Sequence, residues 1–199
     1  MAATVLLIRH AAHDDLNVRL SGRRAGVGLT ESGRAQAERL GRHLAPRQIA
    51  GVVCSPLDRT VETATPLAHA CGLPGPAQED RLTEIDFGDW TGRTFDSLRD
   101  DPAWHHWNLE RHRAKPPGGE SMAAAQARII DWLSDVADTA EGATIAAVTH
   151  CDIVRGAVAH VLGMSLDKLL RFDIDPASIT TVVVGEWGMK LVRLNEKGD

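Results

Sequence analysis

The chain has 199 residues, of which 43% are hydrophobic and 25% charged, and its formal net charge is −5. These values are typical of one globular domain with a substantial core, and the acidic balance argues against a general binder of nucleic acid or membrane surfaces. The apolar runs are too short for a bilayer span or for a signal peptide. Cys54, Cys71 and Cys151 have no metal-binding spacing, and we expect a cytoplasmic protein.

The first half of the chain alternates strand-like and helix-like segments. A strand over Thr4–Ile8 precedes a helix over Gly33–Leu44, with Thr30 as its N-cap. A second strand over Ile49–Cys54 precedes a helix over Asp58–Cys71. This order predicts an α/β fold with a parallel sheet and right-handed crossovers.

The second half continues the alternation after an irregular stretch. We expect short helical pieces over residues 93–117 and no second domain. The other predicted elements, in chain order, are an extended segment Arg81–Phe87, an amphipathic helix Glu120–Ala137, a strand Thr144–Val148, a helix Asp152–Leu162 and a hairpin of Ile179–Val184 with Met189–Leu194.

Two of the predicted strands lead directly into a histidine, His10 in one case and His150 in the other. Ligands of α/β proteins bind outside the carboxyl ends of parallel strands. Together with Arg9, these histidines predict a site for a small, doubly charged anion. Arg59 follows a third strand and lies in the first turn of the next helix, where the helix dipole disfavours a cation. A bound anion would account for its position.

A phosphate group suits this set of side chains. Planar guanidinium groups bind phosphate oxygens with two parallel hydrogen bonds, and a histidine can act as nucleophile. Turnover also needs an acid for the leaving oxygen. Glu84 and Asp86 are the candidates, but they lie two residues apart and face the same side of an extended segment, so alternation does not choose between them.

Six segments resemble, in order, the motifs of the histidine phosphatase superfamily. The resemblance covers nearly the whole chain and implies a phosphoglycerate mutase-like fold, a three-layer sandwich with a mostly parallel central sheet flanked by helices. Ser55–Ala64 is the closest match, to Ser-Pro-Leu-x-Arg-x-x-x-Thr-Ala. The other segments are Leu7–His10, Leu29–Ala37, Leu82–Gly92, Pro117–Ser121 and Thr149–His150.

The resemblance implies a two-step phosphoryl transfer without metal or cofactor. His10 would attack phosphorus and form a phosphohistidine, while Arg9, Arg59 and His150 would hold the phosphate oxygens. Glu84 would protonate the leaving group and then activate water. The resemblance therefore favours Glu84 over Asp86 as the acid.

The chain departs from the family next to the first histidine. The family continues Arg-His-Gly, often with Glu-Thr, whereas this chain has Ala11, Ala12 and His13. Alanine at position 11 requires a negative φ. We expect His13 to contact the substrate, and Asn17 as well, although its spacing is one residue longer than in the family motif.

A second departure follows His150, where the family usually has Gly-Gly and this chain has Cys151 and Asp152. We expect Cys151 to contact the substrate. A carboxylate at position 152 would repel phosphate unless it turned away or paired with an arginine. We expect Asp152 to cap the helix that begins there.

The compact chain favours the phosphatase branch over the mutases, again by resemblance. We expect a single histidine phosphatase domain over residues 1–199, with residues 93–118 as a flap over the active site. The substrate would be a small phosphomonoester, and inorganic phosphate would bind as product. The oligomeric state is left open.

Four alternatives compete with this interpretation. One is phosphoryl transfer of the phosphoglycerate mutase type, and another is a weakly active or non-catalytic phospho-ligand binder, supported by Ala11. A cysteine phosphatase would use Cys151 with Arg155, but only three residues separate them where such loops have five. A metal hydrolase would use His10 and His13 with imidazoles from His105, His106 and His112.

Overall fold

The computed structural model describes residues 2–198, and within this range one six-stranded sheet has the order β3-β2-β4-β1-β5-β6. The first four strands in the chain run parallel to one another, whereas β5 pairs antiparallel with β1 and forms an antiparallel hairpin with β6. The strands are β1 (Ala3–Arg9), β2 (Gly51–Cys54), β3 (Ala77–Gln78), β4 (Thr144–Thr149), β5 (Ser178–Gly185) and β6 (Gly188–Lys197).

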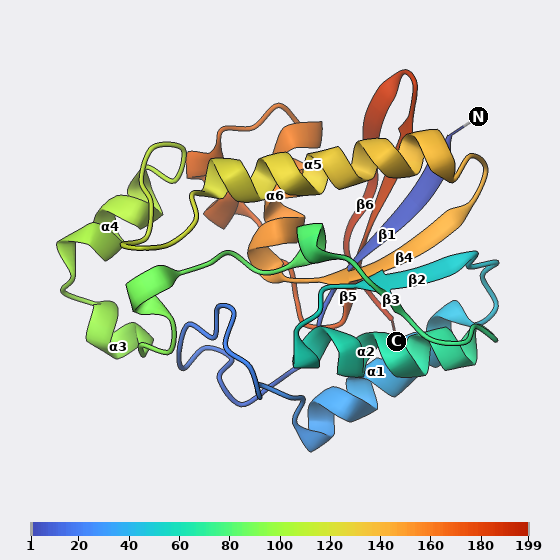
Figure 1. Ribbon diagram of the computed structural model, residues 1–199, viewed down its shortest axis with the longest axis horizontal. Helices are drawn as coiled ribbons and strands as arrows, with labels where there is room; N and C mark the ends of the chain where they lie inside the picture. The colour runs from blue at the N-terminus through green and yellow to red at the C-terminus, as the bar shows by residue number, and fades with distance from the viewer. Residues whose placement is uncertain (1, 199) are drawn as a thin grey trace.

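Helices cover both faces of the sheet, with α1 and α2 on one side and α5 and α6 on the other (Figure 1). Strand β1 has an unbroken apolar run from Val5 to Ile8 because both of its faces are buried. Leu6 and Ile8 pack with α1 and α2, and Val5 and Leu7 pack with α5 and α6. The predicted three-layer α/β sandwich is confirmed. The helices are α1 (Glu31–Leu44), α2 (Asp58–Ala70), α5 (Met122–Thr139) and α6 (Cys151–Val161).

Two short helices, α3 (Phe95–Leu98) and α4 (Pro102–Leu109), lie beyond the carboxyl ends of the strands (Figure 1). They confirm the short helical pieces predicted over residues 93–117. Buried Trp90 and Trp107 pack between this region and the core. Thr94 also forms an isolated antiparallel β-bridge with Arg19, in the loop after β1. The 3₁₀ helices are η1 (Asp80–Leu82), η2 (Gly88–Trp90) and η3 (Leu166–Arg171).

The prediction of an extended segment over Arg81–Phe87 is wrong. Strand β3, at one edge of the sheet, ends before that segment, and η1 follows it. The Glu79 side chain accepts the Arg81 N–H at 3.0 Å, which starts a turn and ends the pairing. Ile85 and Phe87 are buried two residues apart, as a strand pattern would require, but they pack in the core from a segment that is not part of the sheet.

The predicted cap of α1 is confirmed, since Thr30 Oγ1 accepts the Gly33 N–H at 2.9 Å. Gly33 has a second role, because a Cβ at this position would collide with the carbonyl of Ala12. The loop after His10 can therefore lie directly on the start of α1. Helix α5 begins at Met122, with Ser121 as its cap, two residues later than predicted. Among residues 2–198, no helix is long and apolar enough to cross a membrane.

Candidate active site

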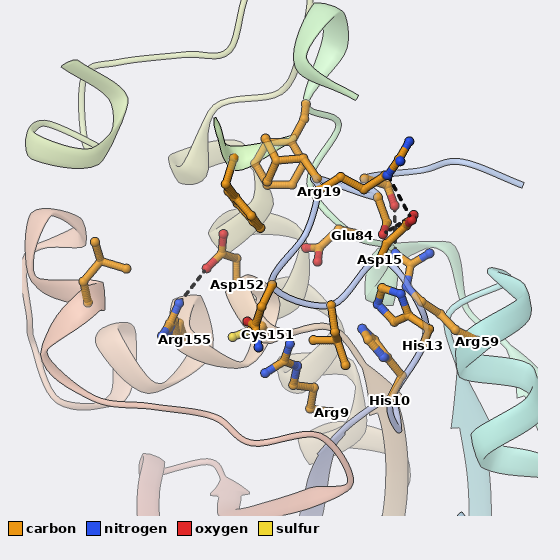
Figure 2. Close-up of a pocket in the computed structure, with 18 of the residues that line it drawn as sticks. Arg9, His10, His13, Asp15, Arg19, Arg59, Glu84, Cys151, Asp152 and Arg155 are labelled. Carbon is orange, nitrogen blue, oxygen red and sulfur yellow. Dashed lines mark hydrogen bonds and ion pairs between the residues drawn. The ribbon is translucent and has the colours of Figure 1, made fainter. Parts of the chain in front are cut away.

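A pocket of about 290 Å³ opens where β1, β2 and β4 end. Figure 2 shows His10, His13 and Arg59 on one side of it and Asp152 with Arg155 on the other. Seven of the eight predicted site residues line the pocket, and His150 lies directly behind them. The seven are Arg9, His10, His13, Asn17, Arg59, Glu84 and Cys151.

His10 is buried, and its ring orientation is fixed by a single hydrogen bond. Its Nδ1 lies 2.9 Å from the carbonyl oxygen of Ala11. Because a carbonyl only accepts, Nδ1 carries the proton and Nε2 keeps its lone pair. Burial, and then the charges of Arg59 and Arg9, hold the pKa of His10 well below its usual range. His10 is thus a neutral imidazole whose Nε2 can act as a nucleophile.

The loop after His10 accommodates alanine without backbone strain. Ala11 is fully buried and is not among the described residues with positive φ, so the condition set by the sequence is met. Its N–H donates to Thr63 Oγ1 at 3.0 Å, and the Ala12 N–H donates to Gln36 Oε1 at 2.9 Å. Side chains from α2 and α1 therefore hold this loop in place.

Unpaired hydrogen-bond donors gather around His10. Arg59 is buried, and its Nη2 donates to the carbonyl of Gly22 at 2.7 Å. Within the described residues, Arg59 Nε and Nη1, Arg9 Nε and His13 Nδ1 are buried without a hydrogen-bond partner. Leaving a buried donor unpaired costs about 1–3 kcal/mol. A group rich in acceptor oxygens, such as phosphate, would satisfy them.

Two helices begin at this end of the pocket without a side-chain cap. Leu57 precedes α2 and His150 precedes α6, and neither side chain caps the helix. Helices α1, α4 and α5 are capped by Thr30, Asp101 and Ser121. Uncapped N–H groups and the positive end of the helix dipole both favour an anion here.

His150 is fully buried and contacts Arg59, which lines the pocket. Its Nδ1 accepts from Arg59 Nη2 at 3.2 Å, so its Nε2 carries the proton and donates to Ser55 Oγ at 2.9 Å. Burial, and then Arg59, lower the pKa of His150 well below its usual range. A direct contact of His150 with phosphate stays a prediction. Ser55, which was not among the predicted site residues, directly follows β2 and orients this ring.

Glu84 and Asp86 have different surroundings. Glu84 lines the pocket, where its Oε1 accepts the Ile85 N–H at 3.0 Å and its Oε2 lies 3.9 Å from His150 Nδ1. Asp86 Oδ1 instead accepts the Gly88 N–H at 2.9 Å inside a turn. Burial, and then the charge of Asp152, raise the pKa of Glu84 to about 7. Such a carboxyl group can both give and take a proton near neutral pH.

The prediction that Asp152 caps α6 is wrong. Its carboxylate binds two arginines, with Oδ2 3.2 Å from Arg111 Nη1 and Oδ1 3.4 Å from Arg155 Nη1. Burial alone would raise the pKa of Asp152, but Arg111 and Arg155 outweigh it and hold that pKa below its usual range. The pairing expected for a carboxylate near phosphate is present, with Arg111 contributed by the segment after α4.

The cysteine and metal alternatives gain no support from the site. Burial, and then the charge of Asp152, raise the pKa of Cys151 to about 11, so its thiolate is scarce at neutral pH. His105 and His106 are exposed on α4, and His112 pairs with Asp167 at 2.7 Å. Across residues 2–198, no group of three His, Cys, Asp or Glu side chains is arranged to hold a metal ion.

A family model of the histidine phosphatase superfamily, branch 1, matches residues 5–197. The chain belongs to this superfamily and is an enzyme of its phosphatase class. Phosphoserine phosphatase 1 of Hydrogenobacter thermophilus is 31% identical over 196 residues, which cover 96% of this chain and 91% of that protein. The bifunctional protein Rv2228c of Mycobacterium tuberculosis is 34% identical over 197 residues, 98% of this chain, but the match spans only 54% of its length.

The solved structures similar to this chain include a mycobacterial glucosyl-3-phosphoglycerate phosphatase, Rv2419c, in complex with inorganic phosphate. It is 26% identical, with a TM-score of 0.85, and the match covers 98% of each chain. The fold described above is therefore that of a histidine phosphatase.

Proposed function

We propose that this enzyme hydrolyses a small phosphomonoester through a phosphohistidine intermediate. His10 Nε2 attacks phosphorus, the ester P–O bond breaks, and Glu84 gives its proton to the leaving alkoxide. Glu84, now ionised, takes a proton from water as that water attacks the phosphohistidine, which releases phosphate and restores both residues. The observation that carries the proposal is a neutral His10 with a free Nε2 among unpaired buried donors.

The remaining side chains have supporting roles in this proposal. Arg9 and Arg59 bind the phosphoryl oxygens and offset the charge that develops during transfer. His13, whose ring centroid lies 5.0 Å from that of His10, adds an N–H donor. His150 holds Arg59 and faces the phosphoryl group when the site is filled. Asn17 and Cys151 contact the ester from the pocket wall.

The reaction as proposed needs no metal and no cofactor. The whole chain acts as one histidine phosphatase domain, with residues 93–118 as a flap over the site. Phe95, Trp104 and Arg111 of this segment line the pocket, which supports that assignment.

Rapid quenching with a ³²P-labelled phosphomonoester tests the intermediate. We expect a labelled enzyme that is stable in alkali and labile in acid, as a phosphohistidine is, followed by release of inorganic phosphate. His10→Ala should abolish both, whereas His105→Ala, on the exposed surface of α4, should keep both. Labelling that survives in His10→Ala would overturn the proposal, as would a wild-type enzyme that releases no phosphate from a broad panel of esters.

A further inference from the structure

The end of the pocket opposite His10 is built around Asp152, which stands where the family motif has glycine. Both terminal nitrogens of Arg111 donate hydrogen bonds, Nη1 to Asp152 Oδ2 at 3.2 Å and Nη2 to Asn108 Oδ1 at 3.1 Å. Both terminal nitrogens of Arg155 also donate hydrogen bonds, Nη1 to Asp152 Oδ1 at 3.4 Å and Nη2 to the carbonyl oxygen of Phe172 at 3.2 Å. The two arginines and the aspartate all line the pocket.

Through these contacts each arginine at this end already donates to two protein acceptors, one of which is the carboxylate of Asp152. A substrate carboxylate or second phosphate binds tightly when a guanidinium offers two parallel N–H groups. The Nε atoms of Arg111 and Arg155 are buried without a partner, but Asp152 already offsets part of the positive charge of both side chains. A second anionic group would also meet the negative charge of Asp152, and juxtaposed like charges are costly where little water is present.

We propose that Asp152 is a specificity-determining residue whose carboxylate takes the place of a second anionic group, so that the pocket selects phosphomonoesters with an uncharged alcohol part. This inference rests on the proposed function, because it concerns the leaving group of that reaction. It is a case of selection against a competitor, in which the protein's own charge excludes an unwanted ligand.

Six apolar side chains of the wall fit an uncharged alcohol. Trp104 is partly buried and packs edge-on against Trp90, and Phe95 at the mouth is 37% exposed. Apolar and aromatic contacts of this kind favour an apolar or aromatic leaving group. The apolar side chains that line the pocket are Leu16, Leu20, Phe87, Phe95, Trp104 and Leu170.

The test compares para-carbamoylphenyl phosphate with para-carboxyphenyl phosphate, which are nearly equal in size and differ in charge. We expect the wild-type enzyme to prefer the uncharged ester in kcat/KM by about tenfold or more. Asp152→Asn should reduce this ratio by about tenfold. The ratio is read within each variant, so a general loss of activity cancels. A para-phenylene bisphosphate arm asks whether a phosphate is excluded as a carboxylate is.

Asp173→Asn is the matched control. Asp173 also pairs with Arg155, at 3.5 Å, but its side chain is 87% exposed and does not line the pocket. Its loss should leave the ratio unchanged. A wild-type enzyme that prefers the carboxylate ester overturns the inference without any variant, and so does an Asp152→Asn ratio equal to that of the wild type.

Binding of the corresponding phosphonates, measured by calorimetry, separates this inference from the proposed function. If the enzyme hydrolyses neither ester but still binds the uncharged phosphonate about tenfold more tightly, the proposed function fails and the selectivity stands. If it hydrolyses both esters and binds both phosphonates equally, the proposed function stands and the inference fails.

Discussion

Both ends of the pocket contain buried arginine, but the arginines differ in their hydrogen-bond partners. At the His10 end, Arg59 is buried with Nε and Nη1 unpaired. At the other end, each terminal nitrogen of Arg111 and Arg155 donates to a protein acceptor, and both side chains pair with Asp152. The partners of an arginine, more than its presence, decide whether it can bind a ligand.

Glu84 lies between these two ends and is affected by both (Figure 2). Asp152 raises its pKa, while Arg59 and Arg128 lower it, and burial makes the largest contribution. Asp152 can therefore influence the chemistry at the His10 end through its charge alone, without contacting the phosphoryl group.

The largest effect that we predict distinguishes the two ends directly. Arg59→Lys replaces a two-point donor with a point charge and should lower kcat/KM for an uncharged ester by about 10²–10³-fold. Arg111→Lys is the matched change at the other end and should cost less than about tenfold, because Arg111 is not needed to hold phosphate. Steady-state kinetics with para-carbamoylphenyl phosphate check both. Equal losses would mean that the two ends do not differ as described.

The second prediction concerns the pH dependence of single-turnover labelling. Glu84 must be protonated to act as acid, so the rate should fall as pH rises through about 7, the folded-state pKa of Glu84. Removing the negative charge in Asp152→Asn lowers that pKa and should move this limb to lower pH. The other groups that act on Glu84, namely His150, Arg59 and Arg128, are unchanged in this variant. A limb that stays in place would show that Asp152 does not act on Glu84.

The sequence predicted the His10 end far better than the other one. His10, Arg9 and Arg59 each follow a strand end or open a helix, and positions of that kind converge in any parallel sheet. Asp152 pairs with Arg111, which is 41 residues away in the chain and lies in an irregular stretch. No periodicity relates such residues. The sequence could therefore indicate only that Asp152 would need an arginine partner near phosphate, not which arginine, and it favoured a capping role for Asp152 instead.

The fold itself followed from local patterns where these were long enough. The apolar run of β1 and the cap at Thr30 both correspond to observed elements. Strand β3 has two residues, too few for an alternating pattern, and the alternation over Arg81–Phe87 reflects packing of a loop against the core. Choosing Glu84 over Asp86 required either the family resemblance or the turn at Gly88.

The third prediction concerns stability at the His10 end in acid. Burial, and then Arg59, lower the pKa of His13 from 6.5 to about 4. The unfolded chain therefore binds a proton more readily between these values, and stability falls as pH drops below 6.5. At pH 5 the loss from His13 is roughly 2 kcal/mol relative to pH 7. His13→Asn should remove this part of the acid sensitivity in urea unfolding, whereas His105→Asn should not. Parallel curves for His13→Asn and wild type would contradict the assignment.

The smallest effect that we predict also lies behind the His10 end, at Ala177. This residue has φ of 58°, which is costly for alanine by about 1–2 kcal/mol. Its N–H donates to the carbonyls of Arg9, at 3.0 Å, and His10, at 3.3 Å, so the strained conformation holds the end of β1. Ala177→Gly removes the strain but adds about 0.4–1 kcal/mol of unfolded-state entropy, which leaves a net stabilisation of about 0.5 kcal/mol.

Ala11→Gly is the matched control for Ala177→Gly, because it makes the same exchange on the other side of His10 at a φ that is not positive. With no strain to relieve, it should destabilise the protein by about 0.5–1 kcal/mol. Urea unfolding of the two variants gives shifts of opposite sign if strain is concentrated at Ala177. Shifts of the same sign would mean that the hydrogen bonds to Arg9 and His10 are held without backbone strain.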